Sequence, residues 1–303
     1  MGRVALLFPG QGSQRVGMGR ELSVLEPARR LFEEACAVLG CDLARLCFEG
    51  PEEELGLTLN AQPALYTVSC AALEALRSRV AVEPFAVAGH SVGEYAAHYA
   101  AGTIGFGAGL GLVRRRAELM HEAASRRPGT MAAVLGLDAE AVRAVCEEAR
   151  SAGIVAVANY NCPGQVVISG ETAAVERASG LARERGARRV VPLAVSGAFH
   201  SPLMVGAGDA LHPFLRAARF RQARVPIVVN VTAEYCRSGV DFAPYLTMQV
   251  SGSVRWEESM RRLLSDGVDT FVELGCGDVL AGLLRRISRE ARAVSVQDLA
   301  SLD

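Results

Sequence analysis

The sequence contains no lysine, and all 32 of its basic residues are arginine. This absence excludes chemistry that depends on a side-chain amine. A P-loop nucleotide site needs a lysine on the phosphates, and pyridoxal or Schiff-base enzymes need an amine nucleophile. The 33 acidic residues leave a formal net charge of only -1. A chain with this balance gives no reason to expect nucleic acid as a partner.

Recognisable metal and targeting motifs are also missing. The eight cysteines form no C-x-x-C pair and no two histidines have metal-ligand spacing, so no metal site is expected. The apolar run before Pro9, residues 4–8, has only five members, too few for a signal peptide. Residues 95–113 carry no formal charge, but their five glycines argue against a membrane-spanning helix. We therefore expect a cytoplasmic protein without a membrane segment.

Short apolar runs alternate with amphipathic patterns, which is typical of an α/β fold. Half of the 303 residues are apolar, enough for a sizeable core. Strand patterns are found at 4–8, 85–88, 225–229 and 269–274. Helical patterns are found at 26–39, 63–80, 92–101, 108–125, 254–266 and 279–291.

The middle of the chain has a different order. From 130 to 193 it runs strand, helix, strand, strand, helix, strand, which is the ferredoxin-like arrangement, with a turn at Pro163-Gly164. We predict a large α/β domain made of residues 1–127 and 195–303. A small domain of residues 128–194 is inserted into it, and a cleft between the two is the expected ligand site.

A G-x-S-x-G motif at 89–93 lies between an apolar strand and a helical pattern. In that context the motif indicates a nucleophile elbow, in which Ser91 is presented over a helix N-terminus. The tight turn requires the smallest side chains at Gly89 and Gly93, and the N–H of Val92 would face a developing oxyanion. Chance occurrence is the alternative in a chain with 31 glycines, but the flanking strand and helix favour a catalytic Ser91.

A serine nucleophile needs a base. His200 lies in a loop where the chain returns from the small domain, and loops at such junctions line clefts. The other histidines are weaker candidates: His90 should point away from the elbow, and helical patterns hold His98, His121 and His212. No acid between 91 and 200 is an obvious partner for His200, and more than 100 residues follow it, unlike the order in ordinary α/β-hydrolases.

Eight ordered motifs carry a family resemblance: LLFPGQGSQ at 6–14, NAQPALYT at 60–67, GHSVGEYAA at 89–97, RRRAELM at 114–120, NYNCPGQVVISG at 159–170, SGAFHSPLM at 196–204, VPIVVNVTA at 225–233 and FVELGCGDVLAGLL at 271–284. Over essentially its whole length the chain resembles the freestanding bacterial malonyl-CoA:acyl carrier protein transacylase family. The resemblance implies a hydrolase-like large domain with a parallel sheet core and an inserted ferredoxin-like (βαββαβ) small domain.

The resemblance also implies catalytic roles. Ser91 would attack the malonyl thioester, and His200 would accept its proton. The backbone N–H groups of Gln11 and Val92 would form the oxyanion hole. Gln249 would orient His200 through its carbonyl oxygen, although by itself it would pass for a surface polar residue.

Arg116 carries the implied substrate preference. It ends a run of three arginines that would otherwise indicate a solvated helix face. The resemblance implies that its guanidinium holds the free malonyl carboxylate through two parallel hydrogen bonds. Residues implied to shape the acyl pocket or to contact the bound acyl chain or pantetheine arm are Gln62, Met120, Asn161 and Phe199.

Two positions depart from the commonest family form. Val92 stands where leucine is frequent, and Cys276 stands where a proline usually precedes the glycine. Neither change removes a catalytic atom. Val92 and Phe199 together fit the pattern that accompanies malonyl selection in related acyltransferase domains.

The implied function is transfer of a malonyl group from malonyl-CoA to the phosphopantetheine thiol of an acyl carrier protein. No bound cofactor is expected, since phosphopantetheine is carried by the partner, and family precedent favours a monomer. A trans-acting acyltransferase of a polyketide synthase has the same chemistry and stays open. Arg116 disfavours a hydrolase of acyl carriers. Intact Ser91, His200 and Arg116 disfavour an inactive binding module, and the want of an acid and of a late histidine disfavours a general esterase.

Overall fold

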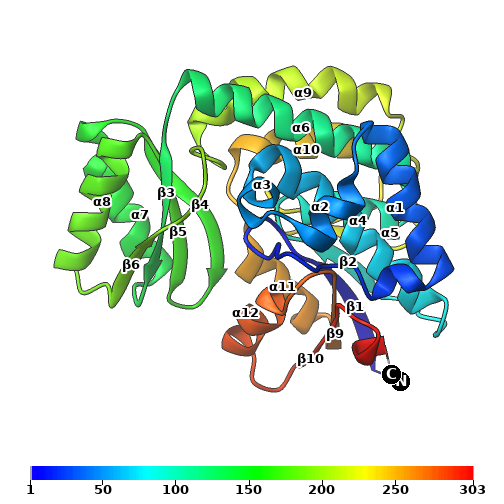
Figure 1. Cartoon of the computed structure of the whole chain (residues 1–303). Coiled ribbons are helices and arrows are strands. Elements are labelled where there is room, and N and C mark those ends of the chain that lie inside the picture. The colour runs from blue at the N-terminus through cyan, green and yellow to red at the C-terminus, as the bar shows by residue number, and fades with distance from the viewer. Residues whose placement is uncertain (1, 303) are drawn as a thin grey trace.

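The computed structural model describes residues 2–302, which form two sheets in two lobes (Figure 1). The large lobe holds a six-stranded sheet with the order β10-β9-β1-β2-β7-β8, and the small lobe a four-stranded sheet with the order β4-β5-β3-β6. The strands are β1 (Arg3–Phe8), β2 (Ala86–Gly89), β3 (Thr130–Leu135), β4 (Val155–Cys162), β5 (Gln165–Gly170), β6 (Arg189–Pro192), β7 (Ile227–Val228), β8 (Tyr235–Cys236), β9 (Val268–Leu274) and β10 (Arg292–Val296).

Helices cover both faces of the large sheet, with α4 and α5 on one side and α11 and α12 on the other (Figure 1). The α-helices are α1 (Glu26–Leu39), α2 (Leu43–Glu49), α3 (Glu52–Gly56), α4 (Thr58–Arg77), α5 (Gly93–Ala100), α6 (Phe106–Arg126), α7 (Ala139–Ala149), α8 (Thr172–Glu184), α9 (Val205–Ala217), α10 (Gly239–Ser251), α11 (Trp256–Ser265) and α12 (Val279–Ile287). No helix within residues 2–302 has both the length and the apolar character to cross a membrane.

The central strands of the large sheet are apolar because they are buried on both faces. Leu6 and Phe8 of β1 pack toward α4 and α5, whereas Leu7 packs toward α11 and α12. β1 pairs in parallel with β2, and Phe8 lies opposite Gly89. The segments that follow these two strands, which carry Gln11 and Ser91, therefore emerge side by side at the carboxyl edge of the sheet.

The small lobe has the expected β-α-β-β-α-β order, and every strand pair in its sheet is antiparallel. Pro163 and Gly164 form the turn between β4 and β5, with Gly164 at a φ of 70°. A separate apolar cluster fills this lobe between its sheet, α7 and α8. The predicted α/β fold class is confirmed by the parallel core and the separate antiparallel sheet. The domain boundaries at 127/128 and 194/195 stay a prediction.

Some predicted element limits were wrong. The helix expected at 63–80 begins five residues earlier, at Thr58, so that Pro63 lies inside it, and it ends at Arg77. The pattern analysis missed α10, which begins at Gly239 and contains Pro244, two residues that disfavour helices. It also missed β10, a short edge strand with partly exposed residues.

Candidate active site

The nucleophile elbow is a strained turn between β2 and α5. Ser91 has a φ of 53°, a left-handed conformation that non-glycine residues adopt only when the surroundings hold them there. A Cβ at Gly89 would overlap the backbone of Gly93, and a Cβ at Gly93 would overlap the carbonyl of Phe8. This close approach explains why the sequence has glycine on both sides of the serine.

His200 is placed to take the Ser91 proton. Its Nε2 lies 2.8 Å from Ser91 Oγ, and its Nδ1 lies 2.9 Å from the backbone oxygen of Gln249 and 3.1 Å from that of Gly252. Carbonyl oxygens can only accept, so Nδ1 must carry the hydrogen. The lone pair of Nε2 therefore faces the serine hydroxyl, as a general base requires.

His200 is thus oriented by two uncharged groups, the backbone carbonyls of Gln249 and Gly252. The side chain of Gln249 has a different set of contacts. It is 0 % exposed, so the expectation of a surface residue from sequence alone was wrong. Its Oε1 accepts from Arg116, and its Nε2 donates to the backbone oxygen of Ser91 at 2.8 Å.

Arg116 points inward from α6 and is 1 % exposed, unlike the solvated helix face that the run of three arginines would indicate alone. One nitrogen, Nη1, donates to Gln62 Oε1 at 2.6 Å. The other, Nη2, donates to Gln249 Oε1 at 2.9 Å and to Ser91 Oγ at 3.1 Å. None of these three partners is charged. A buried guanidinium beside the nucleophile with only neutral partners is ready to receive an anionic group.

A small cavity of about 80 Å³ opens onto these groups. Its lining residues are Gln11, Gln62, His90, Ser91, Val92, Arg116, Met120, Met131, Asn159, Leu193, Val195, Phe199 and His200. The volume suits a short acyl chain. The lining includes every predicted site residue except Gln249 and Asn161; Asn161 instead lies with Oδ1 3.0 Å from His90 Nε2.

The two N–H groups predicted for the oxyanion hole are available. Within residues 2–302, neither the Gln11 nor the Val92 N–H donates to a protein acceptor. Both residues line the cavity beside Ser91. Their role as oxyanion donors stays a prediction.

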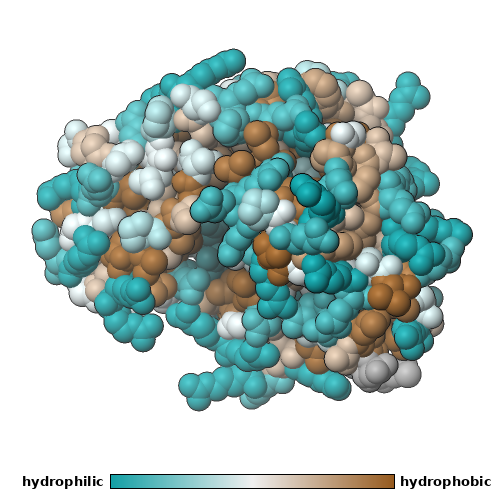
Figure 2. Space-filling view, in the orientation of Figure 1, coloured by the Kyte–Doolittle hydropathy of each residue, from teal (hydrophilic) through white to brown (hydrophobic). Residues whose placement is uncertain are grey.

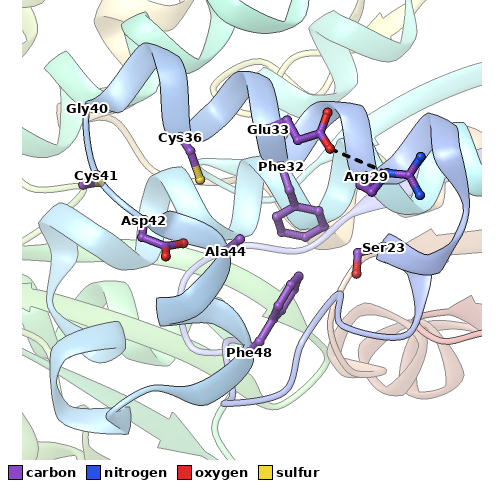
Figure 3. A pocket seen from close by; sticks show the side chains of 10 residues that line it. All are labelled: Ser23, Arg29, Phe32, Glu33, Cys36, Gly40, Cys41, Asp42, Ala44 and Phe48. Carbon is purple, nitrogen blue, oxygen red and sulfur yellow. Dashed lines mark ion pairs between the residues drawn. The ribbon is translucent and has the colours of Figure 1, made fainter.

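A larger hollow of about 810 Å³ lies elsewhere, between α1 and α2 (Figure 3). There Phe32 and Phe48 face each other edge to face, with ring centroids 5.0 Å apart. None of its lining residues belongs to the Ser91 cavity, and it holds no serine–histidine pair. The smaller cavity is the candidate site because the reactive groups converge there. Among the described residues, no cluster of three or more His, Cys, Asp or Glu could bind a metal.

Comparisons with known proteins agree with this geometry. The profile of the acyl transferase domain family matches residues 5–302. The malonyl CoA-acyl carrier protein transacylase of Bacillus subtilis is 46% identical over 305 residues, which is 100% of this chain and 96% of the relative. The chain belongs to this transacylase family. The Escherichia coli K12 protein of the same name is 41% identical over 288 residues, covering 95% of this chain and 93% of that protein.

Solved transacylase structures share the two-lobed fold. A malonyl-transacylase in complex with its type II PKS acyl-carrier protein has a TM-score of 0.96 and 40% identity, covering 99% of this chain and 97% of that one. The acyl-carrier-protein S-malonyltransferase of Burkholderia pseudomallei has a TM-score of 0.96 and 42% identity, covering 99% and 98%. The family membership inferred from the eight motifs is therefore confirmed.

Asn230 of this transacylase, which was not among the predicted site residues, stabilises the nucleophile elbow through its side-chain amide. Its Oδ1 accepts from the Ser91 N–H at 2.8 Å, and its Nδ2 donates to the Gly89 oxygen at 2.7 Å. The residue is buried and lies two positions after the end of β7, the strand that pairs with β2. The quoted motif at 225–233 contains it, but no local pattern indicates that its amide reaches the elbow.

Replacing Asn230 by alanine is expected to lower the rate of Ser91 acylation by about 10- to 100-fold. One buried and one partly buried backbone group would lose their partner, at a cost of up to about 1–3 kcal/mol each, in a turn that is already strained. Asn230→Asp should also be impaired, since a carboxylate cannot donate to the Gly89 oxygen. Rapid-quench acylation of folded protein measures this, and a wild-type rate in Asn230→Ala would contradict the bracing role.

The pH dependence of acylation follows from the burial of His200. Burial, the charge of Arg116 and the charge of His90 lower the pKa of His200 to about 3. The imidazole therefore stays neutral, and able to act as a base, down to that pH. We expect the initial acylation rate to remain nearly flat from pH 8 to pH 5. A histidine with an ordinary pKa near 6.5 would lose about 30-fold over the same range.

The effect of pH on folding stability has to be separated from its effect on the acylation rate. Burial also lowers the pKa of His90 and of His98, the latter to about 3. These histidines therefore bind protons more readily in the unfolded chain, and their contribution to folding stability should be lost as the pH drops below about 6.5. Rates should be taken within the first turnovers, with circular dichroism as a check on folding. A decline centred near pH 6.5 in protein that remains folded would contradict the low pKa of His200.

Proposed function

We propose that this transacylase transfers a malonyl group from malonyl-CoA to the phosphopantetheine thiol of an acyl carrier protein through an ester on Ser91. The observation that carries the proposal is the position of Arg116. Its buried guanidinium lies 3.1 Å from the nucleophile and has only uncharged partners. A malonyl group bound to the serine would present its carboxylate to that cation, whereas an acetyl group would leave it without a counter-charge.

Acylation would proceed by attack of Ser91 Oγ on the thioester carbonyl carbon. The hydroxyl proton passes to His200 Nε2, and the charge on the carbonyl oxygen is stabilised by the N–H groups of Gln11 and Val92. The carbon–sulfur bond then breaks. Coenzyme A leaves with the proton returned by His200, and the malonyl ester stays on Ser91.

Transfer to the carrier would repeat these steps in reverse. The carrier thiol gives its proton to His200 and attacks the ester carbonyl, and Ser91 recovers its proton as the new thioester forms. Water must compete poorly at this stage. The apolar residues Met120, Met131, Leu193 and Phe199 line the cavity and support its exclusion.

The proposal also covers cofactor use, location, oligomeric state and the kind of carrier. Malonyl-CoA is a substrate and phosphopantetheine belongs to the partner, so the reaction needs no resident cofactor. We also propose that the enzyme acts in the cytoplasm as a monomer. A carrier of fatty-acid synthesis and a carrier of polyketide synthesis present the same thiol, and the proposed mechanism serves either.

The fate of the malonyl group tests this function against hydrolysis. The enzyme is incubated with malonyl-CoA and either a holo carrier protein or the same carrier without its phosphopantetheine arm. We expect malonyl-carrier as the main product with the holo form, and little free malonate with either. Rapid release of malonate irrespective of the carrier would assign the protein to the hydrolases instead.

A further inference from the structure

Glu94 is a buried carboxyl beside the reactive groups that takes no part in the mechanism above. It follows the elbow as the second residue of α5 and is 0 % exposed. Its Oε2 accepts from Gln249 Nε2 at 2.7 Å and more weakly from the Asn230 N–H at 3.4 Å. Its Oε1 has no protein partner within residues 2–302. A carboxyl kept only for folding would be expected to have both oxygens paired.

The contacts of Gln249 link Glu94 to the substrate-binding cation. The two hydrogens of Nε2 point to two acceptors, Glu94 Oε2 and the backbone oxygen of Ser91. Neither the Ser91 backbone oxygen nor the ionised Glu94 carboxylate can donate to Oε1, so the amide has one direction only. That direction turns Oε1 toward Arg116 Nη2, 2.9 Å away. If the amide were reversed, its NH₂ would oppose the guanidinium donor.

We propose that Glu94 is a positioning residue for malonyl recognition, which acts through Gln249 to hold the Arg116 guanidinium in place beside the nucleophile. The inference rests on the proposed function, in which the Arg116 guanidinium binds the malonyl carboxylate. An amide between the two charges leaves the guanidinium free of a direct ion pair. A carboxylate paired directly with Arg116 would compete with the malonyl carboxylate for the guanidinium. Gln249 is uncharged, so it can hold the guanidinium in position without that competition.

Electrostatics agree with this arrangement. Burial raises the pKa of Glu94 to about 7, and this rise is opposed by the hydrogen bonds from Gln249 and Asn230 and by the charge of Arg116. The carboxyl is thus held next to a cation that it does not touch. In either protonation state its carbonyl oxygen can accept from Gln249 Nε2.

The test compares Ser91 acylation by malonyl-CoA with acylation by acetyl-CoA, an analogue without the carboxylate. In Glu94→Ala, Gln249 Nε2 loses one of its two acceptors and water can enter, so the Gln249 amide is held less firmly in its position. The ratio of the malonyl to the acetyl rate should fall about tenfold, which is within the range of interaction energies between residues in direct contact, as Glu94 and Gln249 are. Glu94→Gln keeps an acceptor in the same place and should retain most of the ratio.

A double-variant cycle establishes whether the effect passes through Gln249. Gln249→Ala removes the bridging amide but keeps the backbone carbonyl that orients His200. In that background Glu94→Ala should cause no further loss of the ratio. The inference is overturned if Glu94→Ala slows malonyl and acetyl acylation equally, or if its effect on the ratio is the same with and without the Gln249 side chain.

Folding and the underlying function are controlled separately. Thermal unfolding identifies variants that fold; if Glu94→Ala does not, Glu94→Leu replaces it, since leucine fills the same space without an acceptor. A wild-type enzyme that shows no preference for malonyl-CoA over acetyl-CoA would sink the proposed function itself. A wild-type preference that Glu94 variants leave intact would overturn only the role of Glu94.

Discussion

Replacement of Ser91 by alanine should lower malonyl transfer by at least about 10⁴-fold, the scale on which nucleophile removal acts in serine enzymes. Without Oγ no ester can form, and His200 Nε2 has no proton to accept. The fold should survive, since His200 keeps its two carbonyl partners and Arg116 keeps Gln62 and Gln249. Release of coenzyme A in the presence of holo carrier protein measures the loss.

A matched serine variant provides the control. Ser125 is exposed on α6, and its Oγ donates only to the backbone oxygen of His121, so Ser125→Ala should transfer malonyl at the wild-type rate. Thermal unfolding of both variants separates loss of chemistry from loss of fold. Residual transfer in Ser91→Ala within a hundredfold of wild type would contradict a covalent role for Ser91.

Replacement of Arg116 by alanine is expected to have the second largest effect, a loss of about 30- to 5,000-fold in kcat/KM for malonyl-CoA. The estimate corresponds to about 2–5 kcal/mol for removing one partner of a buried, hydrogen-bonded charge pair. Arg116→Lys should recover little, since an ammonium cannot reproduce the planar contacts to Gln62 Oε1 and Gln249 Oε1. Acylation by acetyl-CoA should be far less affected, because acetyl has no carboxylate to bind.

The neighbouring Arg115 is the control for Arg116. Its guanidinium pairs with Glu118 at the protein surface and lies over the ring of Phe214, away from the cavity. Arg115→Ala should therefore leave both acylation rates close to wild type. Parallel losses for malonyl and acetyl in Arg116→Ala would show that the arginine maintains the site rather than recognising the carboxylate.

Those parts of the fold that follow from local pattern were predictable. The central strands are continuous apolar runs because both of their faces are buried, and α1 was predicted with its observed limits, Glu26–Leu39. The elbow was recognisable since its geometry demands two glycines around Ser91. The small lobe was identifiable from the order of its elements, which alternate clearly between period-two and helical patterns.

The site itself depends on contacts that no local pattern encodes. Arg114 and Arg116 are of the same type on the same helix, and only the packing of α6 decides that one is half-exposed and the other buried. Gln249 lies on α10, whose Gly239 and Pro244 conceal the helix. Asn230 reaches the elbow across 139 residues of sequence. Family resemblance supplied Arg116 and Gln249, whereas the roles of Asn230 and Glu94 required the structure.

The face of the molecule shown in Figure 2 carries no comparable signal. Figure 2 shows mostly hydrophilic side chains on the face it presents, with hydrophobic ones in small groups between them. Such a distribution is ordinary for a protein surface. We propose that the substrate preference lies in the buried contacts of Arg116, which a view of the surface does not display.

The most direct test of the account is the intact mass of the enzyme after mixing with malonyl-CoA in the absence of any carrier. We predict a mass increase of one malonyl group, located on the peptide that contains Ser91, and its disappearance when holo carrier protein is added. Acetyl-CoA should give much less adduct under the same conditions. Equal labelling by both thioesters, or a malonyl group on any residue other than Ser91, would contradict the account.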